Sequence, residues 1–447
     1  MHDNCFQKDL MNKIIDQAGN KKAAFLLFLI GAFSMTQIKL GAKIGISEAV
    51  CCMIGPFLFL KNLSVYRRDG VSLYFYLLIF WIFGALFSDY YNHSLFVQYL
   101  RGFTVPLTLF SVSVCVYHLL RKNPSNLKWV LIGIAVSSVI SIFFFQRGVA
   151  GDLAAEGHAV EAVERVVGYK LFWANMVITW VGLPIVCWYR SVPSALMYFA
   201  LIVISFVSLM SGGRALFATS VLSIFFIWLG GKSAQSIHDV QKKIPVVLIV
   251  MLCLAALLKG GYSYAATHGY LSEEETKKYQ QQTAKGTDFL SLLMSGRGDF
   301  FIGLIAALEK PLTGQGTQAL DLQGYEREFV SKYGTDEEVS QFLRKEVLGY
   351  LRVIKSHSHV ICYWMWHGVA GLTFWIYVLC LVIQTVRKRL DFIPEWFGYL
   401  ALTLPIFTWD YFFSPLSLRV SECVLYSSLL VLLRIENLRK RGRLWCG

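Results

Sequence analysis

Long apolar runs recur along nearly the whole chain, and no other feature limits its fold so strongly. Runs long enough to cross ~30 Å of hydrocarbon occupy residues 23–38, 46–61, 72–88, 102–120, 128–145, 170–188, 192–210, 215–230, 244–258, 360–384, 394–413 and 420–435. The chain is 55% hydrophobic and 16% charged, whereas soluble domains carry about 25% charged residues. The sequence therefore predicts an all-α, polytopic membrane protein with about twelve transmembrane helices.

Two polar stretches interrupt this series, at 146–169 and at 259–358. The second follows the ninth predicted helix and holds 12 Lys/Arg and 13 Asp/Glu residues. The chain thus divides into helices one to nine (1–258), a long loop (259–358), and helices ten to twelve with a basic tail (359–447). Within the loop, 289–311 and 336–355 repeat apolar residues at helical spacing, which predicts amphipathic helices that lie on the membrane or cap a cavity.

Positive charges are shared unequally between the two sides of the predicted topology. If the N-terminus is cytoplasmic, the short cytoplasmic segments hold 21 Lys and Arg residues, and the short outer segments hold eight. Because cytoplasmic loops carry the excess of Lys and Arg, both termini are predicted to be cytoplasmic and the long loop external. The net charge of +13 is then a consequence of topology, and it does not indicate a nucleic-acid partner.

The sequence gives no indication of a metal site or another cofactor. Its ten cysteines lack metal-ligand spacing, the adjacent Cys51 and Cys52 included. The first outer loop, at about 39–46, has no Asp/Glu pair of the kind that metal-dependent membrane oligosaccharyltransferases carry there. We therefore expect chemistry without a divalent cation.

Four polar features fall on the outer side of this topology. They are Arg214 after the seventh helix, Arg297 in the long loop, the pair His357 and His359 where the loop returns to the membrane, and Asp410 near the outer end of the eleventh helix. Each has an ordinary explanation by itself, such as an arginine that reaches the lipid headgroups or a histidine at the interface. Two cations, a candidate base and an acid on one face indicate a shared site instead.

The order of these motifs resembles the O-antigen ligase/polymerase superfamily. The chain reads SGGRA, then SGRGDFFIGLIAALEKPLTGQG, then His357-Ser358 followed by nine residues and the GVAG of Gly368 and Gly371. Ligases of that superfamily carry an arginine after helix seven, an arginine in the long periplasmic loop, and a His-[Asn/Ser/Gln]-x9-GxxG motif. The resemblance covers about 205–415 and extends to the helix layout.

The resemblance implies an activity and roles for these residues. The donor would be a glycan on undecaprenyl diphosphate, transferred to an acceptor hydroxyl at the periplasmic face of a bacterial inner membrane, without a metal and with inversion. His357 would be the general base, Arg214 and Arg297 would hold the diphosphate, and Asp410 would orient the histidine or pair with an arginine. His359 would contact substrate, or replace His357 as the base.

The acceptor separates the alternatives. A ligase transfers the glycan to lipid A-core, which the helix number and the His-Ser-x9-GxxG spacing favour, whereas a polymerase uses a second lipid-linked glycan. A transporter of lipid-linked saccharides is an alternative from another functional class. The sequence shows no internal repeat, and its polar residues gather at one surface rather than at mid-depth, which disfavours the transporter.

Overall fold

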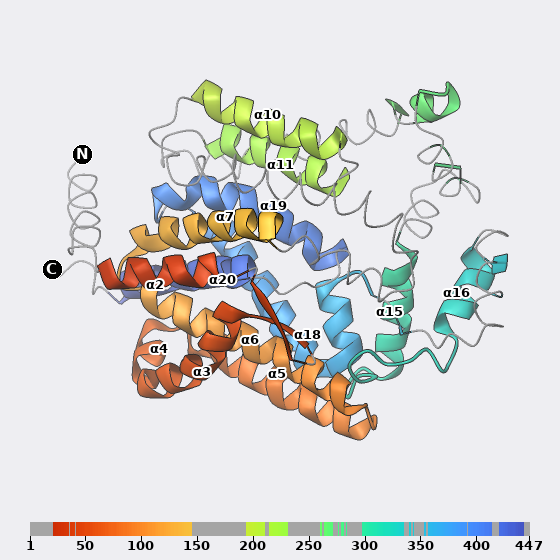
Figure 1. Ribbon diagram of the computed structural model, residues 1–447, viewed down its shortest axis with the longest axis horizontal. Helices are drawn as coiled ribbons and strands as arrows, with labels where there is room; N and C mark the ends of the chain where they lie inside the picture. The colour runs from red at the N-terminus through yellow and green to blue at the C-terminus, as the bar shows by residue number, and fades with distance from the viewer. Residues whose placement is uncertain are drawn as a thin grey trace.

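The computed structural model describes residues 21–144 except 35 and 41, 194–230 except 211–213, 297–334, 356–441 except 391 and 414–419, and short stretches between these ranges. This part is mostly helical (Figure 1). The helices are α2 (Lys21–Ala32), α3 (Ile46–Lys61), α4 (Leu63–Asp69), α5 (Ser72–Tyr91), α6 (Phe96–Leu120), α7 (Leu127–Phe144), α10 (Ser194–Met210), α11 (Arg214–Gly230), α15 (Gly298–Glu309), α16 (Tyr325–Tyr333), α18 (His359–Lys388), α19 (Phe397–Phe413) and α20 (Val420–Lys440). Single 3₁₀ turns at Pro124–Asn126 and Pro394–Trp396 precede α7 and α19.

Helices occupy ten of the twelve segments predicted to cross the membrane. The other two, 170–188 and 244–258, lie outside the described residues. Among the described helices, α5, α6 and α18 are long and apolar enough to cross a bilayer, and α3 with α4, bent by 74°, would make a fourth span. The described part is therefore a helical protein with three or four helices able to span a membrane.

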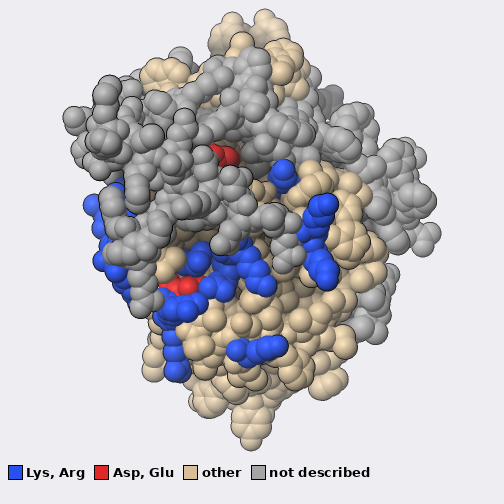
Figure 2. All heavy atoms as spheres, turned by 90° about the vertical axis from the view of Figure 1, so that its left-hand side faces the viewer, with Lys and Arg blue, Asp and Glu red and all other residues tan. Residues whose placement is uncertain are grey.

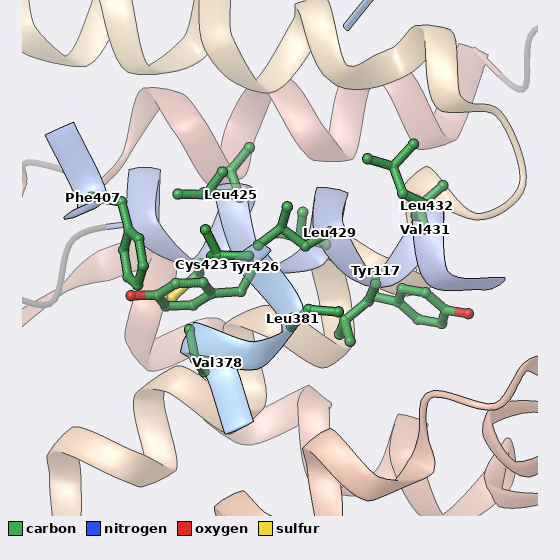
Figure 3. Packing of buried hydrophobic residues seen from close by; sticks show 14 of the residues in the cluster. Tyr117, Val378, Leu381, Phe407, Cys423, Leu425, Tyr426, Leu429, Val431 and Leu432 are labelled. Atoms are coloured by element: carbon green, nitrogen blue, oxygen red, sulfur yellow. The ribbon is translucent and has the colours of Figure 1, made fainter. Parts of the chain in front are cut away.

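The interior of the bundle is built around α6 and α20, whose side chains are buried along most of their lengths. Figure 3 shows Tyr426 and Leu429 of α20 beside Val378 and Leu381 of α18. Where α2 crosses α7, Gly31 and Gly133 face one another, and a Cβ on either would overlap the backbone of the other helix. Such close approach through small residues is typical of helix packing in lipid, where apolar burial alone gives little driving force.

Basic side chains gather at one end of the bundle, which we call the basic end. It is formed by the ends of α4, α6, α18 and α20, and Figure 2 shows Lys and Arg spread over it. The buried Asp69 carboxylate joins these ends, because its Oδ2 lies 2.9 Å from Arg121 Nε and 3.4 Å from Arg434 Nε. Arg389 of the turn after α18 pairs with Glu436 of α20. In the predicted topology this end is the cytoplasmic one, because cytoplasmic loops carry the excess of Lys and Arg; its side of the membrane stays a prediction.

At the opposite end, α15 runs across the ends of the long helices (Figure 1). Helix α18 is interrupted near this end at Gly368, which has φ 61° and ψ −146°. A 30-residue helix would be ~45 Å long if straight, whereas the part after the break matches ~30 Å of hydrocarbon. The break thus separates a membrane-length helix from a short first part, 359–367.

The loop after α15 fills the break in α18. Leu312 O accepts a hydrogen bond from Val369 N at 3.1 Å, Gln315 N donates to Met365 O at 2.6 Å, and Gly316 N donates to Trp366 O at 3.1 Å. Backbone groups that the break would leave unpaired in an apolar surrounding are thereby satisfied. TGQG (313–316) and GVAG (368–371) therefore meet at the break. We call this set of backbone contacts the joint.

Gly368→Ala is expected to destabilise the protein strongly. Its backbone conformation is essentially restricted to glycine, and a Cβ there would overlap Leu312 O. Gly269→Ala is the matched control, since Gly269 also has a positive φ but no atom lies within 4 Å of its would-be Cβ; left-handed φ alone costs ~1–2 kcal/mol. In thermal unfolding of the full chain in detergent, the midpoint should fall much more for Gly368→Ala than for Gly269→Ala. Equal falls would show that the close contact between Gly368 and Leu312 does not stabilise the protein.

Two local predictions differ from the structure, and one helix was not predicted. The run 23–38 was expected to be one helix, but Gln37–Leu40 (β1) pairs with Ala42–Gly45 (β2) as an antiparallel hairpin. The amphipathic helix predicted to reach residue 355 does not include its last turn, because Val353 bridges Leu320 in extended backbone. Helix α16 was not anticipated. Val353 pairs with the distant Leu320, whereas the hairpin pairs two segments that follow one another in the chain.

Candidate active site

The His357 and Asp299 side chains lie against each other at the end of the bundle opposite the basic end. His357 Nδ1 lies 3.1 Å from Asp299 Oδ2, and the two side chains are 44% and 28% exposed. Asp299 stands in the first turn of α15, where the helix dipole favours a negative charge. A carboxylate on Nδ1 holds the imidazole in the tautomer whose Nε2 is free to accept a proton. The pair therefore has the arrangement of an oriented general base.

Ser358 fixes the position of His357 against α19. Its Oγ accepts a hydrogen bond from Ile361 N at 3.3 Å, which caps α18. The same hydroxyl donates to Tyr411 O at 2.9 Å. The serine of the His-Ser pair thus joins the start of α18 to the last turns of α19.

Arg297 precedes α15 and rests on the same part of α19. Its Nη1 donates to Phe413 O at 3.0 Å, and its guanidinium carbon lies 5.1 Å from the Trp409 ring centroid and 5.4 Å from that of Phe413. Burial lowers the pKa of the Arg297 guanidinium, and the nearby Asp299 carboxylate offsets only part of this effect. The group stays charged at physiological pH. Stacked arginines of this kind are held in place with several N–H donors left for a ligand.

Asp410 lies at the same end of the bundle. It is half-buried in α19, between Trp409, which supports Arg297, and Tyr411, which accepts from Ser358. The structure thus brings the segments of His357, Arg297 and Asp410 together around the last turns of α19.

The remaining two candidates are placed differently. His359 is 1% exposed, its ring packs 5.2 Å from the Trp375 ring, and its Nδ1 has no hydrogen-bond partner. Of the two histidines, His357 is the one that reaches the surface. Arg214 is the first residue of α11, and its side chain lies outside the described residues, so its predicted contact with a diphosphate stays a prediction.

A second polar cluster, not anticipated from the sequence, is buried where the loop after α15 meets α5 and α18. Trp81 Nε1 donates to His367 Nδ1 at 2.8 Å, so the proton of the neutral imidazole is on Nε2. His367 Nε2 is 3.0 Å from Thr317 Oγ1, which donates to Asp89 Oδ2 at 2.8 Å. Thr317 N and Ser94 Oγ donate to Asp89 Oδ1 at 2.6 and 2.9 Å. The cluster joins the loop to both helices.

Two of the missed residues carried a signal in the sequence. Asp89 is an acid at the end of an apolar run, as is Asp410, and such a residue requires polar partners. Asp299 follows Arg297 by two residues in SGRGDF. Its pairing with His357 depends on how α15 packs beside α18, which local sequence does not determine.

No three His, Cys, Asp or Glu side chains converge as metal ligands within the part of the chain that the structure describes. Comparison of the chain with protein-family models, curated proteins and solved structures finds no match.

Proposed function

We propose that the protein is a membrane glycosyltransferase that moves a glycan from a polyprenyl diphosphate to an acceptor hydroxyl. The observation that carries this proposal is the His357–Asp299 pair beside a stacked arginine, at the end opposite the basic end. A base and a fixed cation are the two groups that such a displacement requires. With the basic end in the cytoplasm, the reaction takes place at the outer face of the inner membrane of a bacterium.

In the proposed step, His357 Nε2 takes the proton of the acceptor hydroxyl as its oxygen attacks the anomeric carbon. The bond from that carbon to the diphosphate oxygen breaks, and its electron pair leaves with the lipid diphosphate. Arg297, together with Arg214, stabilises the negative charge that develops there, because guanidinium matches phosphate oxygens through paired donors. Asp299 stabilises the imidazolium that forms. Displacement in one step inverts the anomeric centre.

The acceptor decides between two forms of this function. A ligase, which the motif spacing favours, would transfer the finished glycan to lipid A-core, and a polymerase would transfer it to a second lipid-linked glycan. Gel banding of surface polysaccharide in a strain lacking the gene separates them. Loss of a ligase should leave polymer on the carrier lipid, and loss of a polymerase should leave single capped units. Banding identical to that of the parent strain would contradict both.

A further inference from the structure

His357 and Asp299 lie on two segments that meet at the loop 310–317. Asp299 is in the first turn of α15, and the loop directly follows the end of this helix. His357 precedes the first part of α18 (359–367), and the last carbonyl groups of that part accept hydrogen bonds from the loop. The break at Gly368 separates this part from the membrane-length helix. The 3.1 Å contact between His357 and Asp299 therefore depends in part on where the loop is held.

The end of α5 holds both the loop and the first part of α18. The carboxylate of Asp89 is buried, and it accepts hydrogen bonds from N and Oγ1 of Thr317 in the loop and from Ser94 Oγ. The preceding residue, Ser88, donates through its Oγ to Trp366 O at 2.6 Å. Two consecutive residues of α5 thus bind the loop and the last turn before the break. Loss of one partner of a buried hydrogen bond leaves the other unsatisfied, which makes such contacts costly to break.

The hydrogen bonds that run from Trp81 to Asp89 have only one possible direction. The Trp81 indole nitrogen can only donate, so His367 Nδ1 accepts and the imidazole proton is on Nε2. His367 Nε2 then donates to Thr317 Oγ1, and the Thr317 hydroxyl proton goes to the carboxylate of Asp89. An ionised carboxylate can only accept. Each donor of this chain is therefore matched to one acceptor, and no member can be reversed by itself.

We propose that Asp89 is a positioning residue for His357. As the acceptor at the end of this chain of hydrogen bonds, its carboxylate holds the loop and thereby keeps Asp299 of α15 against Nδ1 of His357. Because the Asp89 side chain is buried, it acts through the loop rather than on the substrate. This role rests on the proposed function, in which His357 is the base.

Asp89→Asn is nearly isosteric, but it cannot complete the chain of hydrogen bonds. If its amide nitrogen faces Thr317 N, two donors meet. If the nitrogen faces Thr317 Oγ1, the hydroxyl loses its acceptor, and it regains one only if the His367 proton moves to Nδ1, opposite the Trp81 indole. Either orientation leaves a buried donor without an acceptor, so we expect the loop to shift. The kcat should fall roughly 10–10²-fold with little change in KM, because a displacement of about 1 Å at a catalytic group can cost that much.

The test is a double-mutant cycle on the purified full chain in proteoliposomes, with glycan transfer measured per folded protein. Asp299→Ala removes the contact that Asp89 is proposed to maintain. In this background Asp89→Asn should lower kcat by less than about twofold, whereas changes at residues that share no partner usually add. A merely structural loss would lower turnover by the same factor in both backgrounds. Equal factors would therefore overturn the positioning role of Asp89.

Thr317→Val and Thr317→Ser test the same chain in case Asp89→Asn does not fold. Thr317→Val is nearly isosteric and removes the hydroxyl, so kcat should fall as in Asp89→Asn, again only while Asp299 is present. Thr317→Ser keeps the hydroxyl and should retain most of the turnover of the unmodified protein. Undiminished turnover of Thr317→Val would overturn the positioning role and leave the proposed function standing. Full turnover of His357→Ala would instead overturn the proposed function, and the role of Asp89 with it.

Discussion

His357→Ala is expected to lower glycan transfer by ~10²–10⁴ while the protein still accumulates in the membrane, because a positioned imidazole contributes that much to rate. The His357 side chain is exposed, so its removal leaves no cavity in the core. Transfer is measured as glycan display in a strain that lacks the chromosomal gene and carries the variant on a plasmid. Membrane abundance is measured on the same cells.

Two further variants make this prediction specific. Asp299→Asn keeps an acceptor oxygen near His357 Nδ1 but loses the charge, so it should reduce transfer less than His357→Ala does. His268→Ala is the matched control, since His268 is an exposed histidine of the same loop region that contacts Tyr264, and it should transfer normally. If His357→Ala is active and His359→Phe is inactive, His359 is the base. If both are active, the catalytic mechanism is wrong.

Arg297→Ala should lower transfer by ~10²–10³, the usual effect of removing one preorganised donor that stabilises developing charge. Arg297→Lys keeps the charge but lacks the planar donors that stack on Trp409, so we expect it to restore little of the activity. The same polysaccharide assay measures both variants.

Arg101→Ala is the control for Arg297, because Arg101 is exposed at the same end of the bundle and its Nη1 donates to Gln318 Oε1 at 2.5 Å. Its removal should leave transfer close to the parent level. Full activity of Arg297→Ala would show that Arg297 does not stabilise the leaving diphosphate. Equal losses in Arg297→Ala and Arg101→Ala would show that general positive charge, rather than one placed guanidinium, is required.

Apolar run length was sufficient to locate most helices of the described part, and α3 begins and ends where the sequence predicts. This works because lipid requires every backbone group to be paired within its own helix, so long apolar runs have few alternatives. The β1–β2 hairpin and the break at Gly368 could not be found in this way. The hairpin pairs two adjacent segments, the first of which was predicted as the end of a helix, and the break depends on hydrogen bonds with the loop after α15, which apolar run length does not predict.

The candidate site was predictable in its residue types but not in its pairing. Motif order gave His357 and Arg297, and topology placed them on one side. The carboxylate that lies against His357 is that of Asp299, whereas Asp410 was predicted either to orient the histidine or to pair with an arginine. Choosing between two acids requires knowing that the start of α15 lies beside the start of α18. That relation is determined by the joint between the loop after α15 and α18.

Turnover by the purified protein in proteoliposomes is the decisive assay of glycan transfer. The donor is a glycan on undecaprenyl diphosphate, with an acceptor added on the side of His357, and the product bond and the freed lipid diphosphate are both quantified. We predict one new bond of inverted configuration for each lipid diphosphate released, unaffected by a chelator and lost in His357→Ala. Movement of intact donor between leaflets with no new bond would contradict the account.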